Sequence, residues 1–125
     1  MSHVLVYDCT PTNGASAATL LCGGGFETRV CRDGEALLEE VVQRRPDVVV
    51  YCLRPEHSED LGVLRLLRRV SPDLPLVVLA SSGSLFTQKQ VQVFRPVYYG
   101  VCPMDRGELE GAVRAASLRS AHVAR

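Results

Sequence analysis

Short runs of consecutive apolar residues alternate along the chain with longer segments in which apolar residues recur every three or four positions. The first pattern is typical of strands buried on both faces of a sheet, and the second is typical of amphipathic helices. Their alternation predicts β-α-β units around a parallel sheet, and therefore an α/β fold. Five strands are expected, at His3 to Asp8, Glu27 to Cys31, Asp47 to Cys52, Pro75 to Ala80 and Tyr98 to Cys102.

Three of the connecting segments predict regular helices. The clearest is Asp33 to Arg45, where Asp33 is a suitable N-cap and the apolar residues form one stripe. A second helix is expected from about Glu59 to Val70, and a third from about Asp105 to the C-terminal region.

Two connecting segments are less regular. A short first helix is expected after Gly14, and the glycines at positions 23–25 are suited to end it. From Gln88 to Phe94, valine alternates with glutamine, and Pro96 interrupts the pattern. This segment predicts a short or distorted helix, or an extended stretch.

Composition narrows the class of protein. The 125 residues predict a single domain spanning 1–125. Lys and Arg total 14, as do Asp and Glu, so no basic surface for nucleic acid is expected. The longest apolar run, Val48 to Leu53, is too short to span a membrane. Five cysteines, an odd number without paired CxxC spacing, do not resemble a disulfide framework, so a cytoplasmic protein with mostly reduced thiols is expected.

Several segments, taken in order, resemble the receiver domain of bacterial response regulators. They are 4–9 followed by Pro11, 25–30, 33–47, 72–80 and 99–103. The resemblance implies a doubly wound, five-stranded parallel sheet of the flavodoxin-like order 2-1-3-4-5. In such a sheet the functional site lies at the carboxyl ends of strands one and three, where the strand order reverses.

The resemblance also shows what this chain lacks at that site. Cys52 stands where the family carries its phosphorylated aspartate, and Cys9 replaces one of two paired acids, of which Asp8 remains. Ala80 replaces a hydroxyl residue, and Cys102 replaces the lysine that precedes Pro103, a residue expected to be structural. The degenerate phosphorylation pocket therefore comprises Asp8, Cys9, Cys52, Ala80, Cys102 and Pro103.

These replacements remove the usual chemistry. A thiol cannot form an acyl phosphate, and Mg²⁺ prefers oxygen ligands that thiols do not supply. Phosphoryl transfer also needs fixed positive charge near the transferred group, which the lysine would have provided. We therefore expect no enzyme activity, no catalytic residue, no metal and no cofactor. The expected function is a phosphorylation-independent signalling module that acts through protein–protein interaction.

Two alternatives remain open at this stage. Cys9 and Cys52 on neighbouring strands are close enough for a reversible disulfide, which would make the domain redox-responsive. Cys102 is separated by a further strand, so a zinc site made of all three thiols is not expected. The second alternative, which rests on analogy of fold alone, is that a small ligand binds in the vacated pocket. In the simplest interpretation, the cysteines fill this pocket as small apolar side chains.

A partner surface is expected at the fourth helix, the fifth strand and the final helix, which receiver domains commonly use for dimerisation or output. A homodimer through this face is one option. Tyr98 and Tyr99 alternate on the strand, so one should point inward and the other should be exposed. The residues predicted for partner binding are Tyr98, Tyr99, Arg95, Arg106 and Arg114.

A second arginine group lies on the third predicted helix. Arg65, Arg68 and Arg69 fall on one helical face. Such a face is usually solvated, and it is the alternative site for a protein partner.

Overall fold

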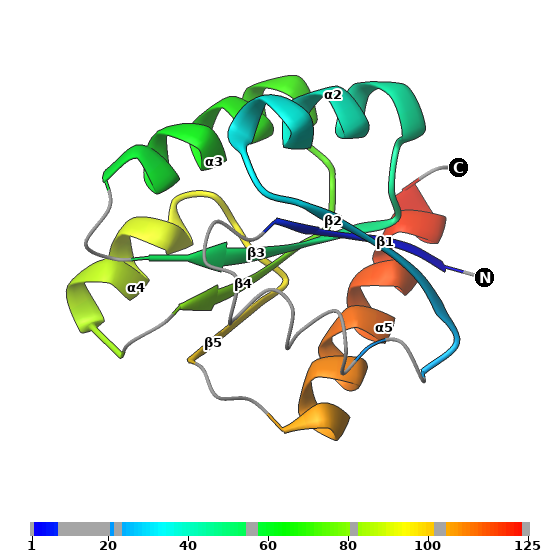
Figure 1. Cartoon of the computed structure of the whole chain (residues 1–125). Helices are drawn as coiled ribbons and strands as arrows, with labels where there is room; N and C mark the ends of the chain where they lie inside the picture. The colour runs from blue at the N-terminus through cyan, green and yellow to red at the C-terminus, as the bar shows by residue number, and fades with distance from the viewer. Residues whose placement is uncertain are drawn as a thin grey trace.

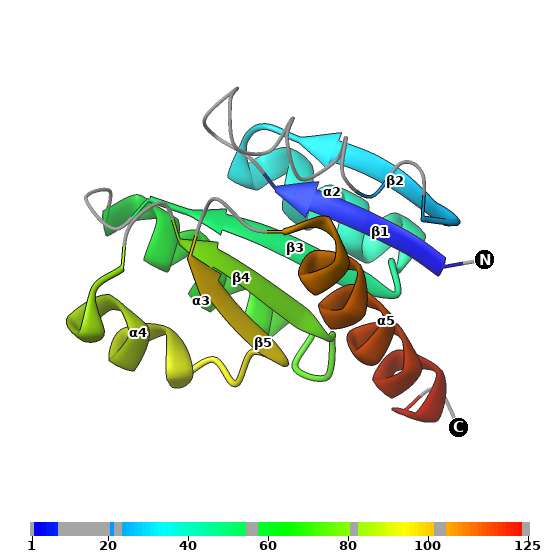
Figure 2. The same ribbon diagram turned by 90° about the horizontal axis from the view of Figure 1, so that it is seen from below.

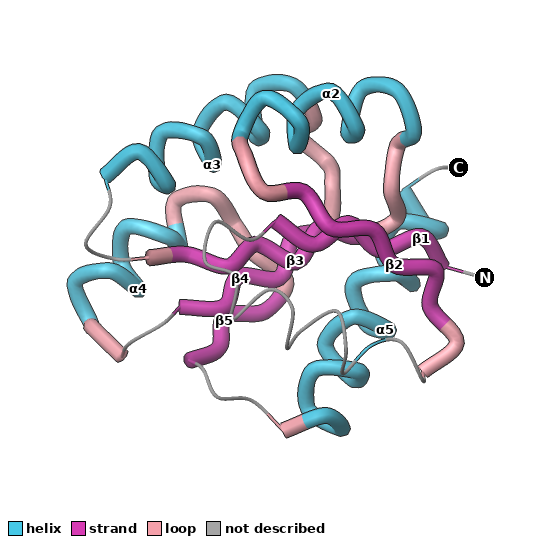
Figure 3. Tube along the Cα trace, viewed as in Figure 1, coloured by secondary structure: helices cyan, strands magenta, loops and turns pink. Residues whose placement is uncertain are grey.

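The structure is a computed structural model that describes residues 2–7, 21, 24–54, 58–80, 83–101 and 105–123. Its sheet has five parallel strands in the order β2-β1-β3-β4-β5, as the receiver resemblance implied (Figures 1 and 3). All five predicted strands are present. Their bounds are β1 Ser2–Tyr7, β2 Phe26–Cys31, β3 Val48–Leu53, β4 Leu76–Ala80 and β5 Tyr98–Val101.

Helices cover both faces of this sheet. Figure 1 shows α2 and α3 on one face and α5 on the other, while Figure 2 shows α4 beside β5 at the edge of the sheet. Their bounds are α2 Gly34–Arg44, α3 Ser58–Val70, α4 Leu85–Gln92 and α5 Arg106–Val123. Of the predicted first helix, only Leu21 belongs to the described residues, and it is helical and fully buried. Among the described residues, no helix is both long and apolar enough to cross a membrane.

The alternation of side chains along the strands divides the core into two apolar layers. Leu5, Val49 and Tyr51 face α2 and α3 and pack with buried leucines of those helices. Val50 and Cys52 point to the opposite face and pack with residues of α5. Because neighbouring residues of a strand point to opposite faces, both layers are continuous over β1, β3 and β4. This arrangement explains why the central strands are apolar throughout.

Side chains cap the N-termini of three helices, α2, α4 and α5. Asp33 Oδ1 accepts a hydrogen bond from the Ala36 amide at 2.8 Å, which confirms the predicted N-cap of α2. Asp105 Oδ2 accepts from the Gly107 and Glu108 amides at 3.0 and 3.3 Å and caps α5 in the same way.

The fourth helix is more regular at its start than its sequence predicted. It begins at Leu85 rather than near Gln88, because Ser84 Oγ accepts a hydrogen bond from the Thr87 amide at 3.3 Å and caps it. It has eight residues and ends before the alternating pattern does. Arg95 then adopts a left-handed backbone with φ of 54°, directly before Pro96. The short helix is thus confirmed, and the extended alternative is wrong.

Candidate functional site

The carboxyl ends of β3 and β4 bring Cys52 and Ala80 to the same edge of the sheet. Cys52 is in register with Leu79, and Leu53 with Ala80. Both Cys52 and Ala80 are buried, at 4% and 0% exposure. This is the edge at which a doubly wound sheet places its functional site. The other four pocket residues, Asp8, Cys9, Cys102 and Pro103, lie outside the described residues. The predicted pairing of Cys9 with Cys52 therefore involves one residue that the structure does not describe.

The described residues that pack around Cys52 are apolar. It belongs to the layer between the sheet and α5, together with Val50, Leu79 and Leu109. A buried cysteine in such a layer behaves as a small apolar side chain. Among the described residues, no group of three or more histidine, cysteine or acidic side chains is arranged to hold a metal ion.

A buried ion pair follows β3 and was not predicted. Asp60 is fully buried in the first turn of α3 and faces Arg54, which comes directly after the strand. Arg54 Nη2 lies 2.9 Å from Asp60 Oδ1, and Arg54 Nε lies 3.1 Å from Asp60 Oδ2. The Arg54 amide donates to Oδ2 as well, at 2.9 Å. Such a bidentate pair fixes the relative orientation of the two side chains.

The sequence did contain a signal for this pair. Asp60 lies on the same helical stripe as Leu64 and Leu67, four and seven residues later, and both leucines are buried. An acid on the buried stripe requires a partner, because an unpaired buried charge is costly. The pair was not predicted because Asp60 lies in the first turn of a helix, where acidic side chains are common on solvated faces.

Two tyrosines connect this ion pair to the centre of the sheet. Tyr7 and Tyr51 are in register on β1 and β3, and their rings stack with centroids 4.6 Å apart and planes 18° apart. The Tyr51 hydroxyl donates a hydrogen bond to the backbone carbonyl of Asp60. The end of β3 and the start of α3 are therefore held by stacking, hydrogen bonding and charge together.

The tyrosines of β5 are arranged differently from the prediction. They do point to opposite faces, but both are half-buried, so neither is the exposed aromatic that was expected. Tyr98 packs beside the α5 layer, and its hydroxyl donates to Glu108 Oε2 at 2.5 Å. Tyr99 packs against the layer that contains Val91 of α4. Both faces of β5 are partly covered because α4 and α5 flank this edge strand (Figure 2).

The hydroxyl of Tyr99 is buried and has no hydrogen-bond partner among the described residues. Burial also raises the pKa of Tyr99 above its ordinary value, because the charged phenolate would lose hydration. Tyr98 likewise has a raised pKa, mainly because its hydroxyl is hydrogen-bonded to Glu108.

The three arginines predicted for partner binding do not lie on one surface. Arg114 Nη2 donates to the Gly24 carbonyl at 3.3 Å, and its guanidinium lies 5.5 Å from the centroid of the Phe26 ring. Phe26 begins β2, which is at the opposite edge of the sheet from β5. The grouping of Arg114 with Tyr98 is therefore wrong, because Arg114 extends from α5 toward β2, whereas Tyr98 of β5 contacts Glu108 in the first turn of α5. Arg106 is exposed at the start of α5.

Apolar side chains are exposed near β5, and sequence analysis missed them. Leu85, Phe86 and Val93 are 68%, 71% and 75% exposed, in and directly after α4. Val101 at the end of β5 is 41% exposed. Phe86 and Val93 are seven residues apart and therefore fall on one side of the helix. This pattern was not recognised in the sequence, because an irregular segment was expected where the structure has the helix capped by Ser84.

The arginine face of α3 is also divided. Arg65 and Arg69 are exposed, as expected of a solvated stripe. Arg68 is not part of it: its guanidinium turns inward and donates to backbone carbonyls, including those of Phe94 at 2.7 Å and Leu74 at 2.5 Å.

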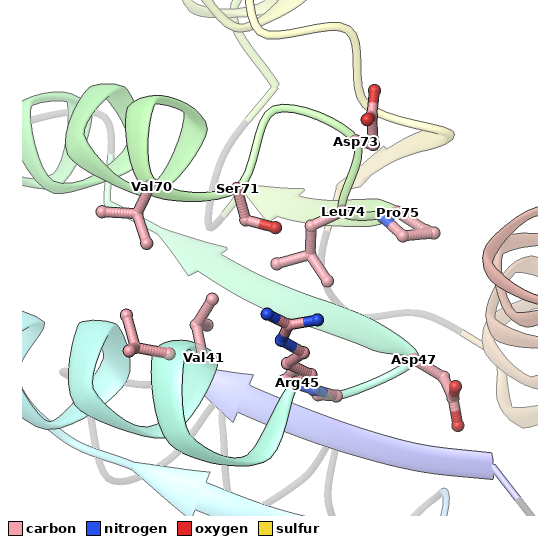
Figure 4. A pocket seen from close by; sticks show the side chains of 10 residues that line it. Val41, Arg45, Asp47, Val70, Ser71, Asp73, Leu74 and Pro75 are labelled. Carbon is pink, nitrogen blue, oxygen red and sulfur yellow. The ribbon is translucent and has the colours of Figure 1, made fainter. Parts of the chain in front are cut away.

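A cavity of about 440 Å³ lies between the ends of α2 and α3 (Figure 4). Val41, Val70 and Leu74 form apolar walls, and Arg45 extends along it. Asp47 and Pro75, which precede β3 and β4, place this cavity at the amino ends of the strands. It therefore lies at the opposite end of the sheet from Cys52 and Ala80, and it is not the vacated pocket.

Comparison with known proteins gives a consistent picture. No family model matches the chain. It is 28% identical over 90 residues to the nitrogen assimilation regulatory protein NtrX of Azorhizobium caulinodans, covering 70% of this chain and 20% of that protein. It is 34% identical over 79 residues to the DNA-binding response regulator MtrA of Mycolicibacterium smegmatis, covering 63% of this chain and 34% of that protein. The chain thus spans between a fifth and about a third of the length of these relatives.

The fold has a close counterpart among solved structures. A CheY-like response regulator receiver domain from Methanospirillum hungatei superimposes with a TM-score of 0.83, at 11% identity and with 98% of each chain covered. The sequence relatives, which are response regulators, align with most of this chain. The receiver-domain structure superimposes on nearly all of it. By its sequence relatives and by its fold, the chain is a receiver domain of the response-regulator type.

Proposed function

We propose that this receiver domain serves two-component signalling without being phosphorylated, and that it acts through contacts with other proteins. The observation that carries the proposal is the position of Cys52. It occupies the end of β3, at the edge where a doubly wound sheet places its site, and it is buried among apolar residues. The proposed role is therefore non-catalytic.

The chemistry at this edge supports the proposal. A cysteine cannot form the acyl phosphate that an aspartate forms. Ala80, at the end of the neighbouring strand, has a methyl group where a hydroxyl would be needed to bind a phosphoryl oxygen. Without such donors, the developing charge of phosphoryl transfer is not stabilised.

The test is to incubate the protein with acetyl phosphate and Mg²⁺ and to measure its intact mass. A response-regulator receiver domain that retains its aspartate serves as the positive control. We expect the control to gain a phosphate adduct and this chain to remain unmodified. A hydroxylamine-labile adduct on most molecules of this chain would contradict the proposal, because that lability is the signature of an acyl phosphate.

The interaction surface is proposed at α4 and β5. Leu85, Phe86 and Val93 are exposed there, and contiguous exposed apolar side chains often mark a protein–protein contact. Tyr98 of β5 is hydrogen-bonded to Glu108 in the first turn of α5, and Arg106 begins that helix; both residues belong to the surface that was predicted from the sequence. A second copy of the chain and a different signalling protein are both compatible with this surface.

A further inference from the structure

A small cavity lined by arginines lies at the amino-terminal edge of β4 and β5. Its volume is about 130 Å³, and Arg68 of α3, Arg95 before β5 and Arg119 of α5 line it together with Asp73. These residues come from the ends of α3 and α5 and from the two loops that lead into β4 and β5 (Figure 2). The cavity is at the other end of the sheet from Cys52, so its role is independent of the proposed function.

Arg68, which lines this cavity, is held in place by hydrogen bonds to backbone carbonyls. Its Nε donates to the Phe94 carbonyl, its Nη1 donates to the carbonyls of Pro72 and Leu74, and its Nη2 donates to the Arg95 carbonyl at 3.2 Å. Four of its five N–H donors are thus used within the chain. The guanidinium is a preorganised positive charge whose position does not depend on a ligand.

Arg95 has an unfavourable backbone conformation. Its φ of 54° is in the left-handed region that favours glycine, and the following residue is Pro96, which biases its neighbour toward extended conformations. The Arg95 amide donates to the Gln92 carbonyl at 3.0 Å, and its own carbonyl is bound by Arg68. Neither contact requires an arginine side chain. These contacts therefore explain the backbone conformation but not the arginine side chain, and strained backbone positions are common at ligand sites.

The positive charges in the cavity are not balanced. Three guanidinium groups and one carboxylate line it, which leaves a net charge of +2. Burial lowers the pKa of Arg68, the charge of Arg95 lowers it further, Asp73 opposes this, and Arg119 adds to the repulsion. Within the described part of the chain, no hydrogen bond or ion pair joins the side chain of Arg95 or Arg119 to a partner.

We propose that this cavity binds a phosphate-type oxyanion, either inorganic phosphate or the phosphate group of a small phosphorylated metabolite. A dianion would balance the net charge, and the planar fork of a guanidinium matches the spacing of phosphate oxygens. A cavity of about 130 Å³ is large enough to hold more than one water. That volume has room for one phosphate group.

The experiment is a two-dimensional amide NMR titration of the full chain with inorganic phosphate, with chloride used to keep the ionic strength constant. We expect saturable shifts of the Asp73, Arg95 and Arg119 amides. Arg119→Gln should weaken phosphate binding about tenfold, the loss expected for one charge-assisted contact. Arg69→Gln is the matched control, because Arg69 is an exposed arginine of α3 that does not line the cavity.

A second variant separates binding from folding. Arg95→Gly removes one cation but keeps the carbonyl that Arg68 binds, and glycine adopts a positive φ without strain. We expect this variant to bind phosphate about tenfold more weakly and to unfold at a higher temperature. A parallel titration with adenosine monophosphate distinguishes the two sources. Tighter binding of the nucleotide indicates a metabolite, and equal or weaker binding indicates free phosphate.

Three results would overturn the proposal. The first is the absence of saturable shifts at constant ionic strength. The second is an equal loss of binding in Arg69→Gln and Arg119→Gln, which would show general attraction of the anion to surface arginines and not a specific site. The third is unchanged phosphate affinity in Arg95→Gly, because the side chain in the strained position would then have no part in binding.

Discussion

Arg54 and Asp60 form a bidentate ion pair across the connection from β3 to α3, with the guanidinium and carboxylate atoms 2.9 and 3.1 Å apart. The Asp60 side chain is 1% exposed and that of Arg54 is 19% exposed. The pair lies next to the strand end that carries Cys52. It therefore fixes the end of β3 relative to the start of α3.

Replacing Arg54 with methionine should destabilise the fold strongly. The substitution keeps an aliphatic side chain but leaves the buried Asp60 carboxylate without its guanidinium partner. Removing one member of a buried ion pair typically costs about 3–5 kcal/mol of unfolding free energy. Urea denaturation of Arg54→Met and of the unaltered protein measures this difference.

The control for this prediction is an exposed ion pair of similar composition. Arg44 Nε lies 3.3 Å from Glu40 Oε2, and the Arg44 side chain is 59% exposed. Arg44→Met should cost less than about 1 kcal/mol, because solvent screens such a pair. Equal costs for the two variants would show that the Arg54 contact contributes no more than a surface pair.

Replacing Tyr99 with phenylalanine should stabilise the protein. The Tyr99 hydroxyl is buried without a hydrogen-bond partner among the described residues, and an unsatisfied buried hydroxyl typically costs about 1–3 kcal/mol. Removing it keeps the aromatic packing of β5. We expect the unfolding free energy to rise by about 1 kcal/mol. A loss of stability in urea denaturation would instead show that this hydroxyl has a partner in solution.

Stability should decline at alkaline pH, with an onset that depends on Cys31. Burial, with the charges of Glu40 and Asp33, raises the pKa of Cys31 from 9.0 to about 11. The folded protein therefore keeps this proton at pH values where the unfolded chain loses it. The contribution to stability is complete below pH 9 and is lost as the pH rises from 9 to about 11.

A Cys31→Ala variant tests this assignment. Its unfolding free energy should change less between pH 8.5 and 10 than that of the unaltered protein, because the thiol that titrates is gone. Above pH 10 both proteins should lose stability, since the pKa values of Tyr98 and Tyr99 are also raised. Parallel curves for the two proteins below pH 10 would assign the onset to another group.

The sequence predicted the sheet well because its signals are local. Each apolar run became a strand, and Asp33 capped α2 through an amide three residues away. The inward role of Arg68 is different, since its guanidinium binds the carbonyl of Phe94, 26 residues later. From the helix sequence alone, Arg68 cannot be distinguished from a solvated arginine, because its partners belong to the loop before β5. The same holds for Arg114, whose partners Gly24 and Phe26 belong to the far edge of the sheet.

The candidate site was predicted in part. Cys52 and Ala80 lie at the strand ends where the receiver resemblance placed them, because strand order and polarity determine those positions. The ion pair behind them was missed, since an acid in the first turn of a helix usually interacts with solvent and the helix dipole. Only the burial of α3 against the sheet shows that Asp60 is enclosed.

The proposed interface gives the last prediction. Phe86→Ala and Val93→Ala should weaken self-association or partner capture about tenfold each, as expected of aromatic and apolar anchors at the centre of an interface. Neither change should affect folding, because the two residues are 71% and 75% exposed. Val42→Ala is the matched control, since Val42 is an exposed apolar residue of α2, at 61% exposure, away from this surface.

Charge and aromatic contacts at the same surface can be tested alongside. Tyr98→Ala removes a half-buried ring and its hydrogen bond to Glu108, whereas Arg106→Glu reverses an exposed charge at the start of α5. Sedimentation velocity reports self-association, and capture from the native host reports other partners. If Phe86→Ala, Val93→Ala and Arg106→Glu all bind as the unaltered protein does, the contact lies elsewhere. The exposed Arg65 and Arg69 face of α3 would then be the surface to test, because it carries the other exposed arginine group predicted from the sequence.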